Sequence, residues 1–255
     1  MGDHLSNWIL RPKPNESADL RLFCLPHLGG SAMIYRTWSQ HLPDSVEVCA
    51  VELPGHGRRI KEVPFSQLGS LVDALVDAIL PCLDRPYALF GHSFGALVCF
   101  ELARELRNRL APIPIHLCVS GAKAPQLIVD GSSIHLLPDK HLIDKFRHLG
   151  GTPETVLENK ELVSALLPAL RADFEILETY VYSNATPLRC PILGLGGAAD
   201  NRVDRASLGA WAEHTIAGFK FKIFPGDHFF IHQAQPQILE TLGEAFEQAL
   251  LMRES

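Results

Sequence analysis

Short apolar segments alternate with longer amphipathic segments along most of this chain. The apolar segments have the length of buried β-strands, and the amphipathic segments repeat their apolar residues at helical spacing. The predicted strands are residues 21–26, 46–51, 87–90, 115–121, 191–197 and 219–224, and predicted helices include 35–38, 70–83, 96–106 and 237–252. This alternation predicts an α/β fold, with a mostly parallel central sheet and helices on both faces. Residues 9–19 contain several prolines and turn residues and predict an irregular lead-in.

The alternation is interrupted between about residue 125 and residue 185. There the pattern predicts only helices, over 139–150, 159–167 and 169–182, with Pro168 breaking or kinking the chain between the last two. An apolar stripe runs through this region at Leu166, Leu170, Phe174, Leu177 and Val181. Core packing explains such a stripe, but an insertion that precedes the last strands would also lie above the strand ends. We therefore expect one domain over 1–255 with a helical lid at about 125–185.

Composition and charge narrow the class of protein. The chain has 255 residues, 47% of them apolar and 20% charged, and its net charge of −6 argues against a surface built to bind nucleic acid. No apolar run approaches the length of a membrane span, and residues 1–8 lack the features of a signal peptide. Six cysteines are scattered without a Cys-x-x-Cys pair, as expected for reduced, buried thiols. These features predict a monomeric cytoplasmic protein that binds no metal, nucleic acid or membrane.

A sharp turn with the pattern Gly-x-Ser-x-Gly joins the predicted strand at 87–90 to the helix at 96–106. Gly91 and Gly95 flank Ser93, and side chains at the glycine positions would collide with the packed strand and helix. Such a turn exposes the serine hydroxyl in a strained backbone conformation, which suits a nucleophile. The pattern also occurs as a chance turn, so its meaning depends on partners elsewhere in the chain.

A nucleophilic serine needs a histidine to accept its proton and a carboxylate to orient that histidine. Asp200 and His228 each lie just beyond a later predicted strand, in the order Ser93, Asp200, His228. Because parallel strands end at the same edge of a sheet, we expect the three side chains to converge, and their order is that of α/β-hydrolases. His56 precedes the serine and does not fit this order. The alternatives are Asp204 and Asp227 for the acid, and His232 and His214 for the base.

A glycine-rich loop at 27–32 follows the first predicted strand. It lacks the Gly-Lys-Ser/Thr ending of a phosphate-binding loop, so it is either a plain tight turn or a loop whose N–H groups face the serine. In the second case the N–H groups of Leu28 and Phe94 would form an oxyanion hole. His27 and His92 adjoin these positions and are expected to contact the substrate, although His92 within the turn could instead be structural.

Five segments together resemble the type II thioesterases of polyketide and nonribosomal peptide pathways, to which the animal fatty-acid chain-terminating thioesterases are near relatives. They are residues 22–31, 52–59, 90–96, 167–173 and 225–230. The Pro-x-Leu-Arg-Ala-Asp sequence in 167–173 is more specific than the serine turn, which many hydrolases share. The chain departs from the family where Leu28 replaces the usual alanine and where Glu52 replaces the usual glutamine. The resemblance implies an α/β-hydrolase fold with the helical lid as an insertion.

The resemblance also implies an enzyme that hydrolyses acyl thioesters from the phosphopantetheine arm of acyl or peptidyl carrier domains, and so removes stalled or wrongly loaded groups. The three converging residues would be its catalytic triad, and it would need no bound cofactor because the phosphopantetheine belongs to the partner. Such carrier domains are usually acidic, so Arg58, Arg59 and Lys61 are either contacts for them or simply solvated charges. Alternatives on the same fold are a medium-chain fatty acyl carrier-protein thioesterase, a carboxylester hydrolase and a scaffold without catalysis.

Overall fold

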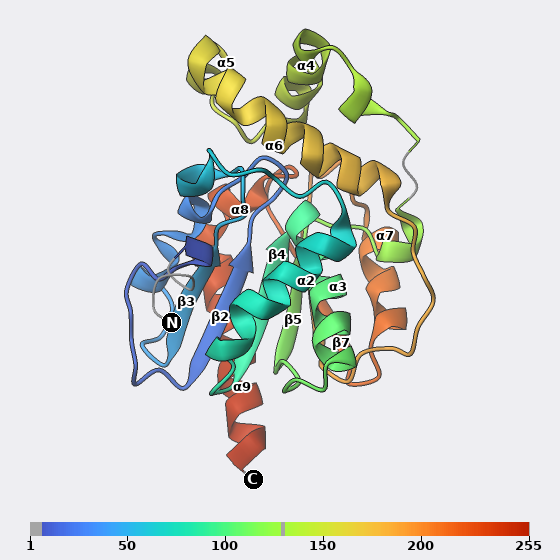
Figure 1. Ribbon diagram of the computed structural model, residues 1–255. Helices are drawn as coiled ribbons and strands as arrows, with labels where there is room; N and C mark the ends of the chain where they lie inside the picture. Colours follow the sequence, from blue (N-terminus) through green and yellow to red (C-terminus); the bar gives the residue numbers. More distant parts are fainter. Residues whose placement is uncertain (1–6, 129–130, 255) are drawn as a thin grey trace.

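A seven-stranded β-sheet lies at the centre of the computed structural model, which describes residues 7–128 and 131–254 (Figure 1). Its strands are β1 (Ile9–Leu10), β2 (Leu20–Leu25), β3 (Val46–Val51), β4 (Tyr87–His92), β5 (His116–Ser120), β6 (Ile192–Gly197) and β7 (Phe219–Phe224). Their order is β1-β3-β2-β4-β5-β6-β7, and neighbours are parallel except β1 with β3. The predicted mostly parallel sheet is therefore confirmed. Most of the signal-peptide argument rests on residues 1–6, which lie outside the described residues.

The short edge strand β1 differs from the irregular lead-in expected for this part of the chain. Ile9 and Leu10 pair antiparallel with Val51 and Ala50 of β3. The strand ends before Pro12, because proline has no N–H to donate to a neighbouring strand. A strand of two residues is too short to show an alternating pattern, so this pairing is not visible in the sequence.

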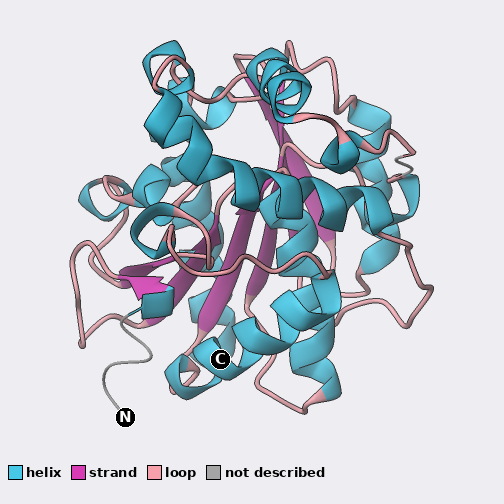
Figure 2. Cartoon of the chain, turned by 45° about the horizontal axis from the view of Figure 1, so that its top comes forward, coloured by secondary structure: helices cyan, strands magenta, loops and turns pink. Residues whose placement is uncertain are grey.

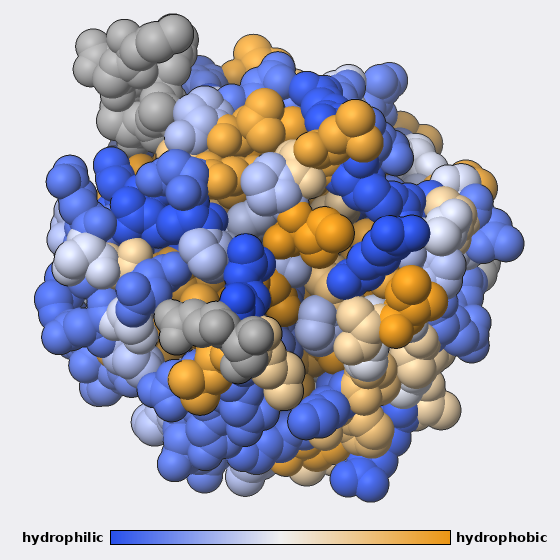
Figure 3. All heavy atoms as spheres, turned by 90° about the horizontal axis from the view of Figure 1, so that it is seen from below, coloured by the Kyte–Doolittle hydropathy of each residue, from blue (hydrophilic) through white to orange (hydrophobic). Residues whose placement is uncertain are grey.

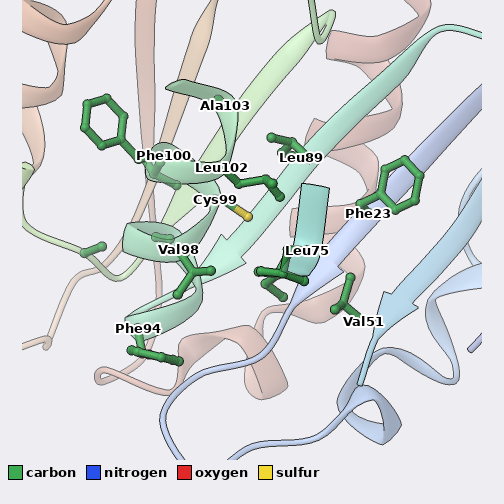
Figure 4. Packing of buried hydrophobic residues seen from close by; sticks show 14 of the residues in the cluster. Phe23, Val51, Leu75, Leu89, Phe94, Val98, Cys99, Phe100, Leu102 and Ala103 are labelled. Atoms are coloured by element: carbon green, nitrogen blue, oxygen red, sulfur yellow. The ribbon is translucent and has the colours of Figure 1, made fainter. Parts of the chain in front are cut away.

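Side chains of the central strands alternate between apolar clusters on the two faces of the sheet. Leu89 and Phe90 are adjacent in β4 and fully buried, yet they belong to different clusters. Figure 4 shows Cys99 and Leu102 of α3 directed toward Leu89. The six cysteines are unpaired; Cys82 is half-buried and the others are buried.

Helices cover both faces of the sheet. The face to which Leu89 points is covered by α2 (Leu68–Ile79), α3 (Phe94–Asn108) and α7 (Arg205–Gly209), and the opposite face by α8 (Phe230–Gln233) and α9 (Gln235–Glu254).

Short 3₁₀ helices replace the helix expected at 35–38. They cover Ala32–Tyr35 and Trp38–Gln40. Tyr35 and Trp38 are buried and pack edge to face, with ring centroids 4.8 Å apart, and both also contact Phe90. The packing of these large rings, rather than a helical repeat, therefore determines the path of this connection.

The segment between β5 and β6 forms a helical cap over the carboxyl-terminal edge of the sheet (Figure 1). Figure 2 brings this side forward and shows the helices crossing the ends of the strands. This is the region expected to be a lid, of which residues 129 and 130 lie outside the described residues. The helices of the cap are α4 (Asp139–Leu149), α5 (Glu154–Leu157) and α6 (Lys160–Thr179).

Helix α6 continues through Pro168, where the sequence predicts that the proline breaks or kinks the chain between two separate helices; the two predicted helices are one. Leu166 before the proline, and Leu170 and Phe174 after it, pack against the same apolar cluster. Their shared packing offsets the cost of an interior proline, which is about 3 kcal/mol. Val181 lies beyond the end of α6 and is 84% exposed, so the predicted stripe ends before it.

The face opposite the cap has apolar side chains interspersed with polar ones (Figure 3). The end of α9 projects on this side, and its Leu251 and Met252 are exposed (Figure 1). Among the described residues, no helix is long and apolar enough to cross a bilayer. The cap therefore distinguishes the carboxyl edge of the sheet from the amino edge, and the residues predicted to carry chemistry lie at the capped edge.

Candidate active site

The backbone turns sharply at Ser93, between β4 and α3. Its φ of 53° and ψ of −116° lie outside the regions that residues with a side chain usually adopt. The N–H of Ser93 donates a 2.7 Å hydrogen bond to the carbonyl of Ser120, which anchors the turn to β5. A Cβ at Gly91 would lie 2.1 Å from the carbonyl oxygen of Gly95, and a Cβ at Gly95 would lie 2.4 Å from that of Leu25. The prediction that both glycines are needed for close packing is confirmed.

The structure brings Ser93, His228 and Asp200 together at the edge of the sheet. Nε2 of His228 lies 3.1 Å from Oγ of Ser93, and Nδ1 lies 2.9 Å from Oδ2 of Asp200. A carboxylate can only accept a hydrogen bond, so Nδ1 carries the proton and Nε2 accepts from the serine hydroxyl. The side chains of His228 and Asp200 are 8% and 0% exposed, so little water competes for these bonds. The arrangement can therefore move a proton from the serine hydroxyl to the imidazole.

Asp200 is held in its charged form. Burial disfavours the charge, but hydrogen bonds from His228 and from the N–H groups of Arg202 and Val203 outweigh it, and the pKa of Asp200 lies below its ordinary value. The backbone bonds are 2.8 Å from Arg202 and 3.2 Å from Val203. The carboxylate is thus ionised at neutral pH and can orient the imidazole and stabilise its protonated form.

The competing acids are engaged elsewhere. Asp204 caps α7 by accepting a 2.7 Å hydrogen bond from the N–H of Ser207. Asp227 is exposed and accepts a 2.8 Å hydrogen bond from the N–H of Phe229. Within the described part of the chain, neither carboxylate hydrogen-bonds to the ring of His228. The geometry therefore selects Asp200 over both alternatives.

The competing histidines also lie apart from the serine. His214 packs against Trp211 and forms a hydrogen bond with Gln126. His232 stacks on Phe229, with ring centroids 6.5 Å apart. Neither ring hydrogen-bonds to Ser93 in residues 7–128 and 131–254, so His228 alone of the three meets the geometric requirement for a base there.

Leu28 and Phe94, whose N–H groups are expected to stabilise an oxyanion, line the same pocket as Ser93. The carbonyl of His27 accepts a 2.8 Å hydrogen bond from the N–H of Gly30. The N–H of Leu28 belongs to the same planar peptide unit as that carbonyl, so it points the opposite way. No acceptor among the described residues is bonded to the N–H of Leu28 or Phe94. Both donors are therefore available to a bound ligand.

His27 lines the pocket, at the position where a contact with substrate is expected. Its Nδ1–H donates a 2.9 Å hydrogen bond to the carbonyl of Leu28. Burial lowers the pKa of His27 to about 4, so the ring is neutral at neutral pH. Its proposed part in substrate binding is thus that of a neutral polar ring.

His92 does not reach the pocket, which corrects the expectation that it contacts the substrate. Its side chain is fully buried, and its Nδ1 lies 2.9 Å from Oγ of Ser120. Its ring centroid lies 5.4 Å from that of His228. At the end of β4 its side chain packs into the interior behind His228, where it supports that ring but has no surface for a ligand.

A pocket of about 320 Å³ opens beside Ser93 and His228. The strand ends supply one wall, and α4 and α6 of the cap supply the other. Charged side chains in the lining include Lys123 and Arg202. The lining is mostly apolar and includes Leu97, Ile134, Phe146, Leu149, Phe174 and Leu177. Such a pocket can hold an apolar chain with its reactive end beside the serine hydroxyl.

Comparison with known proteins identifies the family of this chain. A family model described as the thioesterase domain matches residues 20–246. The chain belongs to the thioesterase family. This thioesterase is 43% identical over 238 residues to GrsT, a gramicidin S biosynthesis protein of Aneurinibacillus migulanus, with 93% of each chain covered.

Further relatives agree with this assignment. The thioesterase is 36% identical over 238 residues to the thioesterase PikA5 of Streptomyces venezuelae, a match that covers 93% of this chain and 84% of PikA5. The solved structure of BorB, the type II thioesterase from the borrelidin biosynthetic cluster, superimposes with a TM-score of 0.86 at 37% identity. That match covers 93% of this chain and 97% of BorB. The resemblance to type II thioesterases and the predicted α/β-hydrolase fold are confirmed.

Sequence reasoning missed one contact near the site of this thioesterase. Asp173 of α6 accepts a 2.8 Å hydrogen bond from the N–H of Gly29 and lies 3.0 Å from Nε2 of His56. His56 and Asp173 are separated by 117 positions, so no local pattern joins them. The available signal was that both lie in segments that carry the family resemblance, 52–59 and 167–173.

Proposed function

We propose that this protein hydrolyses acyl thioesters carried on the phosphopantetheine arm of carrier domains in polyketide or nonribosomal peptide synthesis, and so frees carriers that hold stalled or wrong acyl groups. One observation carries the proposal: the serine–histidine–aspartate arrangement opens directly onto an apolar pocket beneath the cap. Membership of the thioesterase family supports the reaction. Similarity to GrsT, PikA5 and BorB supports the biosynthetic setting.

The reaction follows from the geometry. Oγ of Ser93 attacks the thioester carbonyl while its proton passes to Nε2 of His228, and Asp200 stabilises the resulting imidazolium. The N–H groups of Leu28 and Phe94 would stabilise the oxyanion that forms on the carbonyl oxygen. The carbon–sulfur bond then breaks, and the pantetheine sulfur leaves with the proton from His228. Water, activated by His228, attacks the acyl-enzyme in the same way and releases the carboxylic acid.

We propose that this reaction needs no bound cofactor. The leaving group is a thiol with an ordinary pKa of about 8.5, a far better leaving group than an alkoxide. The three side chains and the backbone donors can therefore supply the proton transfers and the charge stabilisation. Treatment with a chelator should leave turnover unchanged, and a loss that added metal restores would contradict this proposal.

Carrier domains of this kind are usually acidic, and this chain as a whole also carries a net charge of −6. Binding of such a partner therefore requires a local basic contact on this chain. Arg59 is engaged within the fold: it pairs with Glu62 at 2.6 Å, and its guanidinium lies 4.1 Å from the ring centre of Trp8. Arg58 is also paired, 3.9 Å from Glu52, but its side chain is 48% exposed against 10% for Arg59, so we assign the contact to Arg58 and to exposed Lys61. We propose that this contact is made in the cytoplasm. Reversing both charges should raise KM for a carrier-bound substrate and leave KM for a small pantetheine thioester unchanged.

Substitution of the nucleophile tests the reaction directly. Ser93→Ala should lower turnover of an acyl thioester by several orders of magnitude, about 10⁶-fold where a nucleophile is removed from a complete triad. Circular dichroism should show an unchanged fold, since Ala is smaller than Ser. Equal turnover in this variant would end the proposal.

A panel of substrates tests the substrate class. Wild-type protein should hydrolyse short acyl groups from carrier domains faster than it hydrolyses simple esters of the same acids. Faster ester hydrolysis would indicate a carboxylester hydrolase instead. A strong preference for medium-chain fatty acyl groups would indicate a role like that of the medium-chain S-acyl fatty acid synthase thioesterase of Rattus norvegicus, a relative that is 31% identical over 226 residues.

A further inference from the structure

The cap and the loop that carries Leu28 are joined by a buried carboxylate. Oδ2 of Asp173, on α6, accepts a 2.8 Å hydrogen bond from the N–H of Gly29, the residue that follows Leu28. The side chain of Asp173 is 3% exposed. Asp173 is therefore placed to fix the backbone next to a proposed oxyanion donor.

His56 compensates the charge of Asp173. Nε2 of His56 lies 3.0 Å from Oδ2 of Asp173, and Nδ1 lies 3.0 Å from the carbonyl oxygen of Pro54. Both partners are acceptors, so both ring nitrogens act as donors and the ring is a cation. The negative charge of Glu52 also raises the pKa of His56. A carboxylate this deeply buried would be costly without such a partner.

The cap also packs directly on Gly29. The φ of Gly29 is +68°, and a Cβ there would lie 2.6 Å from Cδ2 of Leu170 and 2.8 Å from Cζ of Phe146. Leu170 lies on α6 and Phe146 on α4, so helices of the cap close over the loop from above. The loop is thus held on one side by the hydrogen bond between Gly30 and His27 and on the other by the cap.

We propose that Asp173 is a positioning residue for the reaction: by binding the N–H of Gly29 it holds the loop in the conformation that aims the N–H of Leu28 at the oxyanion. His56 pairs with the same carboxylate oxygen, and a hydrogen bond to a charged acceptor is stronger than one to a neutral acceptor. The inference rests on the proposed function, because it assumes an oxyanion beside Leu28. The inference goes beyond that function because it makes the oxyanion site depend on the cap. When α6 is displaced, Asp173 moves away from Gly29 and the site is incomplete.

The test compares variants within α6 on a small acyl N-acetylcysteamine thioester, which needs no carrier docking. Asp173→Ala should lower kcat by about 10- to 100-fold, less than the 10²- to 10³-fold loss typical of an entire oxyanion donor, with KM changed by less than about 3-fold. Asp173→Asn keeps an acceptor for Gly29 and should recover most of that loss.

Glu178 provides a matched control on the same helix. Its side chain is also 3% exposed, and among the described residues it accepts hydrogen bonds from the N–H groups of Ile134 and His135, within the cap. Glu178→Ala removes hydrogen bonds inside the cap and leaves the contact between Asp173 and Gly29 in place, so kcat should change by less than about 3-fold. An equal fall of kcat in Glu178→Ala and Asp173→Ala would show that the cap is merely disrupted, and would overturn the proposal.

A transition-state analogue gives a second readout. An alkyl trifluoromethyl ketone forms a hemiketal with Ser93 whose oxyanion needs the N–H of Leu28, so its Ki should rise in Asp173→Ala by the same factor as kcat/KM falls. An unchanged Ki, or an unchanged kcat, would overturn the inference. If Asp173→Ala does not fold, Asp173→Asn carries the test: its Ki should rise by less than about 10-fold and by the same factor as its kcat/KM falls, and a fall of kcat/KM without a rise of Ki would overturn the inference. Retained turnover in Ser93→Ala would instead refute the proposed function, so the two failures are distinguishable.

Discussion

The pair His228–Asp200 and the pair His56–Asp173 have nearly the same geometry, with nitrogen–oxygen distances of 2.9 and 3.0 Å. They differ in what lies on the far side of the imidazole. His228 faces the hydroxyl of Ser93, which can donate a proton to it, whereas His56 faces the carbonyl of Pro54, which can only accept. The first ring can therefore cycle between neutral and charged forms, while the second is held as a cation. The second neighbour of a histidine, rather than its acid, decides whether it can act as a base.

The pairs also differ in the parts of the fold that they join. Asp200 and His228 follow the adjacent strands β6 and β7, so both belong to the edge of the sheet. His56 follows β3, but Asp173 lies on α6 of the cap. The first pair is as rigid as the sheet, and the second depends on where the cap lies.

Replacing each aspartate by asparagine should separate the pairs most strongly. Asp200→Asn should lower kcat by about 10⁴-fold, because the amide favours the wrong tautomer of His228. Asp173→Asn should lower kcat by less than about 10-fold, the scale of one weakened hydrogen bond. Steady-state kinetics on the same thioester measures both. Comparable losses would mean that the two pairs are not functionally distinct.

Alanine at a glycine should show how much less tolerant the sheet edge is than the cap. The methyl of Gly91→Ala would lie 2.1 Å from a backbone carbonyl oxygen, so the free energy of unfolding should fall by at least about 3 kcal/mol. A Cβ at Gly131, in the segment of the cap, meets nothing within 4 Å, and Gly131→Ala should stay within about 0.5 kcal/mol. Urea denaturation measures both values, and a neutral Gly91→Ala would contradict the close packing at the turn.

The pH dependence of stability should have opposite signs at His27 and His56. The pKa of His27 falls from 6.5 to about 4 on folding, so the unfolded chain takes up its proton first and stability decreases as pH falls from 6.5 toward 4. That difference corresponds to about 3 kcal/mol. The pKa of His56 is raised: burial opposes its charge, but Asp173, the carbonyl of Pro54 and the charge of Glu52 together outweigh burial. Its contribution is therefore complete below pH 6.5 and is lost as pH rises through the raised value.

Denaturation curves of single variants measure these contributions. His27→Asn keeps a donor for the carbonyl of Leu28 and should reduce the acid loss of stability. His56→Gln should flatten the alkaline side instead. The assignment of signs fails if His56→Gln changes only the acid side.

The smallest effect is expected at Leu28, where the family usually has alanine. The proposed oxyanion donor there is a backbone N–H, which Leu28→Ala leaves in place, so kcat should change by less than about 3-fold. The side chain lines the pocket, so its removal should shift preference toward bulkier acyl groups. A panel of acyl thioesters measures this preference, and a large fall of kcat would assign the leucine side chain a part in the chemistry.

Much of the fold and the site could be predicted from local patterns. Short apolar segments and helical repeats gave the parallel sheet, because burial on both faces leaves that signature in each strand. The turn at Ser93 carries its own steric requirement in Gly91 and Gly95. The convergence of Asp200 and His228 on Ser93 follows from parallel strands ending at one edge.

Other features were decided only by tertiary contacts. Pro168 lies inside a continuous helix because apolar residues on both sides of it pack on one surface, and His92 is buried because the chain folds over it. The pairing of His56 with Asp173 depends on how the cap settles on the sheet, and the 117 positions between them carry no periodic signal. The sequence by itself thus determined the strands, the serine turn and the order of the reactive residues, since these depend on neighbours along the chain. Only the tertiary structure decided how the cap meets the oxyanion loop, since that depends on side-chain packing between distant segments.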